Sequence, residues 1–131
     1  MRKSILAIFL TLGAASSSEV RASGHDGNRL LDKCNRVIRA VDDGVVSSAT
    51  SEGIEAGHCL GLIKGIIKLN MVYQAKDRDG ALFCPPSKIS SGQAVRIVVK
   101  YMRDNPSELH NEESLVAIAA FIDAYPCADG R

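Results

Sequence analysis

The sequence predicts an all-α fold: a small bundle of four, or four to five, helices stapled by two disulfides. Three observations predict it. Apolar residues recur at helical spacing in four separate segments. Residues typical of helix ends flank these segments. The chain also carries four cysteines, and an even number of cysteines in an exported chain indicates disulfides.

The composition indicates one compact domain. The chain has 131 residues, of which 46% are hydrophobic, so it is too apolar for a disordered chain and long enough for one core. Its net charge is only +1. Binding to nucleic acid or to an anionic membrane surface requires a basic patch, and we therefore expect neither as a partner.

Residues 1–22 have the pattern of a secretory signal peptide. Two basic residues precede an apolar stretch from Ile5 to Ala15, and Val20-Arg21-Ala22 offers small residues at a cleavage site. The apolar stretch is too short to span a bilayer. An uncleaved anchor or an ordinary first helix is the alternative interpretation. We expect cleavage, export and a single helical domain over residues 23–131 that has no membrane contact.

The first helix is expected between a cap at Asp26 or Asn28 and a stop at Asp42-Asp43-Gly44. One apolar stripe along it predicts the buried face. The stripe consists of Leu30, Leu31, Cys34, Val37, Ile38 and Val41.

The second helix is expected to begin near Glu52, capped by Thr50 or Ser51, and to end within residues 76–80. Lys64 and Lys68 interrupt its apolar sequence, which argues against a membrane span. Its predicted buried side consists of Cys59, Leu60, Ile63, Ile66, Ile67 and Met71.

Four glycines recur every fourth residue along this second helix: Gly53, Gly57, Gly61 and Gly65. Each costs roughly 1 kcal/mol relative to alanine in a helix interior, so the row calls for an explanation. One explanation is close packing by a neighbouring helix of the same chain, and the other is a self-association face. We favour packing within the chain.

The third helix is expected to follow Ser90, because Ser90 and Gln93 form the pattern of a capping box. Pro106, preceded by Asp104 and Asn105, stops it. The β-branched residues in this segment also suit a strand, but the capping box and the apolar stripe favour a helix. The stripe consists of Val95, Val98, Val99 and Met102.

The fourth helix is expected to be capped by Asn111, with Glu112 and Glu113 in a solvated first turn, and to close at Tyr125-Pro126-Cys127. Its predicted buried face consists of Leu115, Ile118, Ala119 and Ile122.

Four cysteines allow three pairings. Short loops favour antiparallel neighbouring helices, which puts Cys34 and Cys59 at similar depths in the first hairpin. In the second hairpin Cys84 precedes the third helix and Cys127 follows the fourth, so matching ends meet. We therefore predict the disulfides Cys34–Cys59 and Cys84–Cys127.

A search for catalytic residues finds no motif. His25, His58 and His110 are not at the spacing of metal ligands, and the sequence lacks a nucleophile elbow, a phosphate-binding loop and a Cys-x-x-Cys pair. Cys59 beside His58 suggests a thiolate pair, but a structural cysteine explains it better. We therefore predict no catalytic residue, no metal site and no cofactor, and a binding role rather than an enzyme.

Five segments of the sequence resemble one known family in their order and spacing, including a Cys-x-Gly, a Cys-x-Pro and a terminal Pro-Cys motif. They are Leu30 to Cys34, Cys59 to Gly65, Phe83 to Pro86, Ser91 to His110 and Ala119 to Cys127. The family is the Rap/Tai immunity proteins, and the resemblance covers about residues 28 to 127.

This resemblance implies a small, all-helical periplasmic protein, often dimeric. The characterised members of the family bind peptidoglycan amidase effectors that type VI secretion delivers, and they block the active-site cleft of the enzyme. The implied partners are thus an amidase effector and a second copy of the chain. A small disulfide-stapled stress or chaperone-like protein of the periplasm is the alternative, and a thiol oxidoreductase is a third interpretation that needs a free cysteine.

The junction between the third and fourth helices is the predicted partner-binding site. It combines basic, acidic and histidine side chains on a turn held by Pro106. An ordinary solvated loop is the competing interpretation. The predicted contact residues are Arg103, Asp104, Asn105, Glu108 and His110.

Overall fold

The computed structural model describes residues 24–44, 49–77 and 80–128. The described residues include four α-helices and the short 3-10 helix η2 but no β-strand, so the predicted all-α fold is confirmed. The helices are α1 (Gly27–Asp43), α2 (Thr50–Lys76), α3 (Ser91–Asp104), η2 (Pro106–Glu108) and α4 (Glu113–Ala124). The predicted signal peptide lies outside the described residues.

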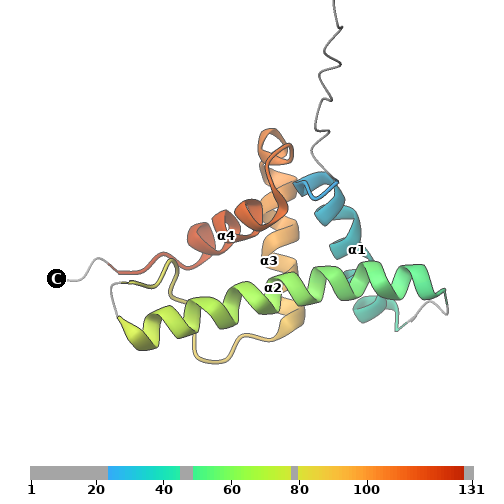
Figure 1. Cartoon of the computed structure of the whole chain (residues 1–131). Helices are drawn as coiled ribbons and strands as arrows, with labels where there is room; N and C mark the ends of the chain where they lie inside the picture. The colour runs from blue at the N-terminus through green and yellow to red at the C-terminus, as the bar shows by residue number, and fades with distance from the viewer. Residues whose placement is uncertain (1–23, 45–48, 78–79, 129–131) are drawn as a thin grey trace, which may run out of the picture.

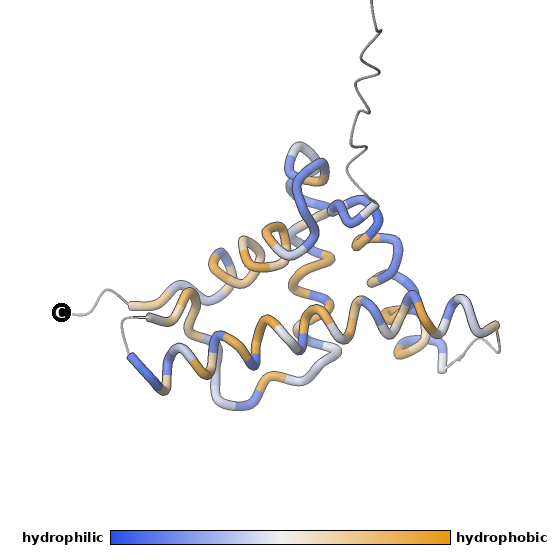
Figure 2. The backbone as a smooth tube through the Cα atoms, viewed as in Figure 1, coloured by the Kyte–Doolittle hydropathy of each residue, from blue (hydrophilic) through white to orange (hydrophobic). Residues whose placement is uncertain are grey.

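Helix α2 is the longest element, and α1 and α3 cross it steeply, while α4 lies beside α3 (Figure 1). Helices α1 and α3 therefore meet α2 at steep crossings and are not the side-by-side antiparallel neighbours of α2 that short loops suggest. Hydrophobic residues are concentrated in α3, α4 and α2, whereas the junction between α3 and α4 is mainly hydrophilic (Figure 2). One core joins all four helices and includes Phe83 from the segment before α3.

The ends of α1 and α3 form as predicted. The Asp26 side chain caps α1 by accepting a hydrogen bond from the Arg29 amide at 3.0 Å. Gly44 ends α1 in the left-handed conformation, with φ 65°, which a glycine adopts without steric cost. Ser90 caps α3 by accepting a hydrogen bond from the Gln93 amide at 3.1 Å.

The predicted buried stripes of these two helices are largely confirmed. All four stripe residues of α3 are buried. In α1 the residues Leu30, Cys34 and Val37 are buried, whereas Val41 near the end of the helix is 57% exposed. A stripe therefore predicts burial well where a helix carries polar residues on its other side.

The prediction for α4 is wrong in its cap and in its face. Glu112, not Asn111, is the N-cap, and its carboxylate accepts from the amides of Ser114 and Leu115. Leu115 is 61% exposed and Ile122 is 43% exposed. Because α4 is apolar almost all round, periodicity cannot select a face, and contact with α3 decides it. The residues that α4 buries are Glu113, Val116, Ala117, Ala120 and Phe121.

Helix α2 also differs in part from its prediction. It begins at Thr50, with Ala49 rather than a hydroxyl side chain at the N-cap, and it ends at Lys76 as expected. Cys59 and Ile63 are fully buried, but Met71 is 47% exposed. The polar residue Asn70 is buried in its place.

The interpretation of the glycine row as packing within the chain is wrong. A Cβ atom built on any of Gly53, Gly57, Gly61 and Gly65 meets no described atom within 4 Å. The row therefore lies on the surface of α2.

Both predicted disulfides are present. Cys34–Cys59 joins α1 to α2 with a Cα–Cα distance of 5.3 Å. Cys84–Cys127 joins the segment before α3 to the segment after α4 with a Cα–Cα distance of 4.9 Å. All four cysteines are thus bridged, which removes the free cysteine that the oxidoreductase interpretation needs. Among the described helices, none is both long and apolar enough to cross a bilayer.

Candidate functional site

The candidate partner-binding surface is the α3–α4 turn, which we define as residues 103–112. It projects from the helical body beside the start of α1 (Figure 1). Four of the five predicted contact residues are exposed on it, and Asn105 is half-buried. The structure thus brings the five residues together on one protruding end.

Backbone contacts fix this turn to the first residues of α1. The Gly27 amide donates to the Asn111 carbonyl at 3.0 Å, and the Asn28 amide donates to the Leu109 carbonyl at 3.2 Å. The Asn28 side chain donates to the same Leu109 carbonyl at 3.0 Å. A Cβ atom on Gly27 would lie 3.1 Å from the Leu109 backbone, which is tighter than an ordinary contact, so this close approach favours glycine. The turn is therefore held by the body of the protein.

Two of the predicted contact residues are engaged with the end of α3 and with α1. The Asn105 side chain donates to the Tyr101 carbonyl at 2.9 Å and so ends the helix. Arg103 donates to the Asn35 side chain of α1 at 2.7 Å. Both contacts fix the point where the turn leaves α3.

The other three contact residues make only local contacts. Asp104 accepts a hydrogen bond from Lys100, which raises the pKa of that lysine. Glu108 accepts from the Asn111 side chain at 2.8 Å. His110 donates through Nδ1 to the Ser107 carbonyl at 2.7 Å, so this contact does not use the other ring nitrogen, Nε2. The exposed carboxylates and the imidazole can thus bind polar groups of a partner.

A second cluster lies at the start of α4 and was not predicted from the sequence. The Glu113 carboxylate oxygen Oε1 lies 2.7 Å from His58 Nε2 and 3.1 Å from His25 Nδ1. Its other oxygen lies 3.7 Å from Lys33 Nζ. The two histidine rings stack with a centroid distance of 5.7 Å.

The prediction of a solvated first turn is therefore half wrong. Glu112 is exposed, but Glu113 is only 5% exposed. The Glu113 amide donates to the His25 carbonyl at 2.9 Å, and this hydrogen bond holds Glu113 beside the start of α1. His25 and His58 lie 88 and 55 positions from Glu113 in the sequence, so no short motif could show the cluster.

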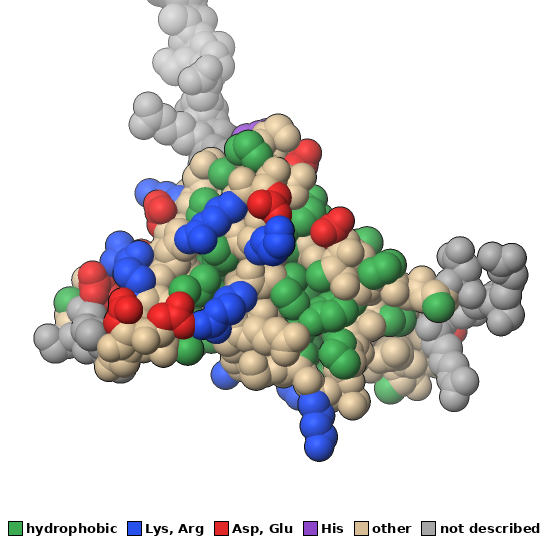
Figure 3. Space-filling model, turned by 180° about the vertical axis from the view of Figure 1, so that it is seen from behind, with side chains coloured by type: hydrophobic (Ala, Val, Ile, Leu, Met, Phe, Trp, Pro, Cys, Tyr) green, Lys and Arg blue, Asp and Glu red, His purple; other side chains and the backbone are tan. Residues whose placement is uncertain are grey.

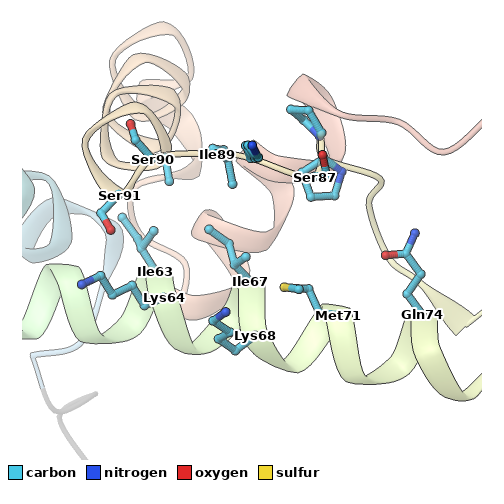
Figure 4. Close-up of a pocket in the computed structure, with 14 residues that line it drawn as sticks. Ile63, Lys64, Ile67, Lys68, Met71, Gln74, Ser87, Ile89, Ser90 and Ser91 are labelled. Carbon is cyan, nitrogen blue, oxygen red and sulfur yellow. The ribbon is translucent and has the colours of Figure 1, made fainter.

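A groove of about 450 Å³ runs between α2 and the segment of residues 85–91. Figure 4 shows Ile63, Ile67 and Met71 pointing from α2 into this space, with Ile89 on the opposite side. Lys64, Lys68 and Lys88 also line it. The groove suits an apolar group flanked by acidic ones, and the sequence signal for it was the mixture of lysine and isoleucine on α2.

On the face of the molecule that is turned away in Figure 1, apolar and charged side chains lie in separate regions. Seen from behind, hydrophobic side chains gather towards the C-terminus, and most charged side chains lie on the other half (Figure 3). Leu115 and Ile122 are the largest exposed apolar side chains of α4.

Comparison with known proteins identifies the family. The family model of the Rap1a immunity proteins matches residues 26–127, which include all four helices and both disulfides. No curated protein and no solved structure matches the chain. The match covers well over half of the sequence, so the chain belongs to the Rap1a immunity protein family.

Proposed function

We propose that this protein is a periplasmic immunity protein that binds and inhibits a peptidoglycan amidase effector delivered by type VI secretion. The family match over residues 26–127 is the observation that carries the proposal. The signal-peptide pattern of residues 1–22 and the two disulfides support an oxidising, exported location. The role needs no reactive group, because a protein that occupies an active-site cleft inhibits by exclusion.

The α3–α4 turn is the surface that we propose enters the cleft. Its backbone is fixed to α1 by hydrogen bonds from Gly27 and Asn28, so little conformational entropy is lost when it binds. Arg103 supplies a guanidinium, Asp104 and Glu108 supply carboxylates, and His110 supplies an imidazole. These groups give the turn the polar chemistry that selects one partner among related enzymes.

The test measures how strongly the protein inhibits the amidase effector of the same organism while that enzyme hydrolyses peptidoglycan. Alanine at all five predicted contact residues is expected to weaken inhibition by at least 100-fold, which corresponds to the loss of about 2.7 kcal/mol of binding free energy. The matched control replaces the exposed residues Arg39, Asp43 and Lys76, which lie at the far ends of α1 and α2, and should inhibit as the wild type does.

The two parts of the proposal fail separately. If the five-residue variant inhibits as strongly as the wild type, the α3–α4 turn is not the binding surface. If the wild-type protein neither binds the amidase nor protects a cell that carries the amidase in its periplasm, the function is wrong.

We also propose that the protein forms a homodimer through the solvent face of α2. Ile54, Leu69 and Val72 on this helix are 67%, 58% and 61% exposed. The row of open glycines on the same helix permits close approach of a second backbone. In a two-fold symmetric dimer, the same surface of the second subunit would cover these apolar side chains and glycines.

Analytical ultracentrifugation tests the dimer. Leu69→Asp is expected to convert a wild-type dimer to monomer, because it places a charge in the apolar contact. Leu115→Asp is the control, since Leu115 is 61% exposed on α4 and lies outside the proposed contact. A wild-type monomer, or a dimer that survives Leu69→Asp, contradicts this surface.

A further inference from the structure

We propose that His25, His58 and Glu113 form a Zn²⁺ site that ties together the starts of α1 and α4 and the first half of α2. The inference is independent of the proposed inhibition. It rests on the geometry of three side chains that come from three separate segments of the chain.

Each of the three residues offers one ligand atom of a type that zinc prefers. The atoms are His25 Nδ1, His58 Nε2 and Glu113 Oε1, and all three lie within 4.8 Å of one another. Two imidazole nitrogens and one carboxylate oxygen leave the fourth position of a tetrahedral zinc ion to water.

The ion can enter only if the three ligand atoms shift, because Oε1 has to move away from the two nitrogens while the nitrogens, which lie within 4.8 Å of each other, come closer together. Tetrahedral zinc with bonds of about 2.0 to 2.2 Å requires ligand atoms about 3.4 Å apart. The two nitrogens lie 3.1 and 2.7 Å from Oε1. The side chain of His25 is 55% exposed, so this ring is free to turn and open the space.

The carboxylate is in an environment that a cation would improve. Glu113 is only 5% exposed, and within the described part of the chain its oxygen Oε2 accepts no hydrogen bond. Lys33 Nζ lies 3.7 Å from Oε2, beyond hydrogen-bond distance, and supplies one balancing charge on that side. The oxygen Oε1 faces the two imidazoles, and a zinc ion there would place a double positive charge directly beside the buried carboxylate.

Metal binding would change the tautomers of both histidines. Without metal, a carboxylate oxygen accepts from both rings, so the proton is on Nδ1 of His25 and on Nε2 of His58. Zinc requires a lone pair on those same nitrogens, so the proton moves to Nε2 of His25 and to Nδ1 of His58.

Calorimetric titration of the metal-free protein with Zn²⁺ is the primary experiment. We expect one ion per chain with a micromolar or tighter dissociation constant. His58→Gln should weaken binding at least tenfold, and the half-exposed position of His58 makes this variant compatible with folding. The matched control is His110→Gln, which removes an exposed histidine outside the cluster and should bind as the wild type does.

Two further measurements separate a built site from a loose surface contact. When zinc is added, nitrogen-15 NMR should show that the protonated ring nitrogen changes in His25 and His58 but not in His110. Zinc in excess should raise the Tm of the wild-type protein by several degrees and leave that of His58→Gln unchanged.

Three outcomes would overturn the proposal. The first is the absence of saturable binding at 100-fold excess of Zn²⁺. The second is binding by His58→Gln with wild-type affinity. The third is binding that is lost in His25→Gln but kept in both His58→Gln and Glu113→Gln, which would place the ion on the chain near His25 alone.

Discussion

At the scale of single residues, Asn70 shows how one buried amide connects a helix to a loop. It is 3% exposed on α2. Its Nδ2 donates to the Phe83 carbonyl at 2.7 Å, and its Oδ1 accepts from the Leu82 amide at 2.8 Å. Phe83 in turn stacks on Phe121 of α4 with a centroid distance of 4.9 Å. Asn70 therefore positions the aromatic pair that closes the core.

Replacement of Asn70 by alanine should strongly destabilise the protein. It leaves a buried carbonyl and a buried amide of the loop without partners, which costs about 2 to 3 kcal/mol of unfolding free energy. Gln74→Ala changes an exposed residue one turn further along α2, and should stay within about 0.5 kcal/mol of wild type. Urea denaturation measures both variants, and equal midpoints for Asn70→Ala and wild type would refute the role of this amide.

Glu112 makes the stability of α4 depend on pH. Hydrogen bonds from the Ser114 hydroxyl and from the amides of Ser114 and Leu115 lower the pKa of this carboxyl below its ordinary value of 4.5. A lowered pKa means that ionisation stabilises the folded state. The stabilisation is complete above pH 4.5 and is lost as the pH falls through the pKa of the folded protein.

Glu112→Ala should therefore cost about 1 kcal/mol at pH 7 through loss of the cap, and less at pH 3. Stability of both proteins is measured by urea denaturation at the two pH values. A difference that is the same at pH 7 and pH 3 would show that the charge of the cap contributes nothing.

At the scale of elements, α2 leaves more apolar side chains exposed than its sequence leads one to expect. Its apolar residues are spread around the whole helix, yet it buries only Cys59, Ile63 and Asn70 fully. The other helices cover a single face, so apolar side chains and the glycine row remain on its surface. An apolar helix with one covered face is typical of a protein that places this helix against a partner.

Opposite effects are expected when alanine replaces glycine in α2 and in α1. Gly61→Ala should stabilise the monomer by up to about 1 kcal/mol, because the new methyl group meets no described atom and alanine is the better helix former. Gly27→Ala should destabilise it, because the methyl group would lie 3.1 Å from the Leu109 backbone. Both are measured at low protein concentration, where a dimer is dissociated. A destabilising Gly61→Ala would mean that α2 is covered within the chain after all.

At the scale of the whole molecule, the two disulfides act on different parts of the structure. Cys34 and Cys59 are fully buried and join α1 to α2 across the core. Cys84 and Cys127 are half-buried and close the opposite end, where the chain enters α3 and leaves α4. The sequence separations are 25 and 43 residues, so the second bridge closes the longer loop.

Removal of each bridge by paired Cys→Ala changes should rank the two contributions. Loop entropy alone costs about 3 to 4 kcal/mol for either bridge, with slightly more for the longer loop. Burial adds a cavity for Cys34 and Cys59, so we expect their removal to lower stability more. If removal of Cys84–Cys127 is the more damaging change in urea denaturation, chain entropy outweighs core packing here.

The sequence alone determined the fold class, the cap of α3 and both disulfide pairings, and it narrowed the cap of α1 to Asp26 or Asn28. These features depend on residues close together in the chain, such as Asp26 with Arg29 or Ser90 with Gln93. The pairings followed from the order of the helices and the positions of the cysteines. The sequence also placed the five residues of the α3–α4 turn on one exposed end, because they lie within eight positions of one another.

Only the tertiary structure decided which faces of α2 and α4 are buried and which distant residues meet. In both helices the apolar residues are not confined to one face, so the position of their neighbours selects the face that packs. The cluster of His25, His58 and Glu113 joins residues up to 88 positions apart and leaves no local pattern. Its existence depends on α1 and α4 starting side by side, where the Glu113 amide binds the His25 carbonyl, and that juxtaposition is a property of the packed chain.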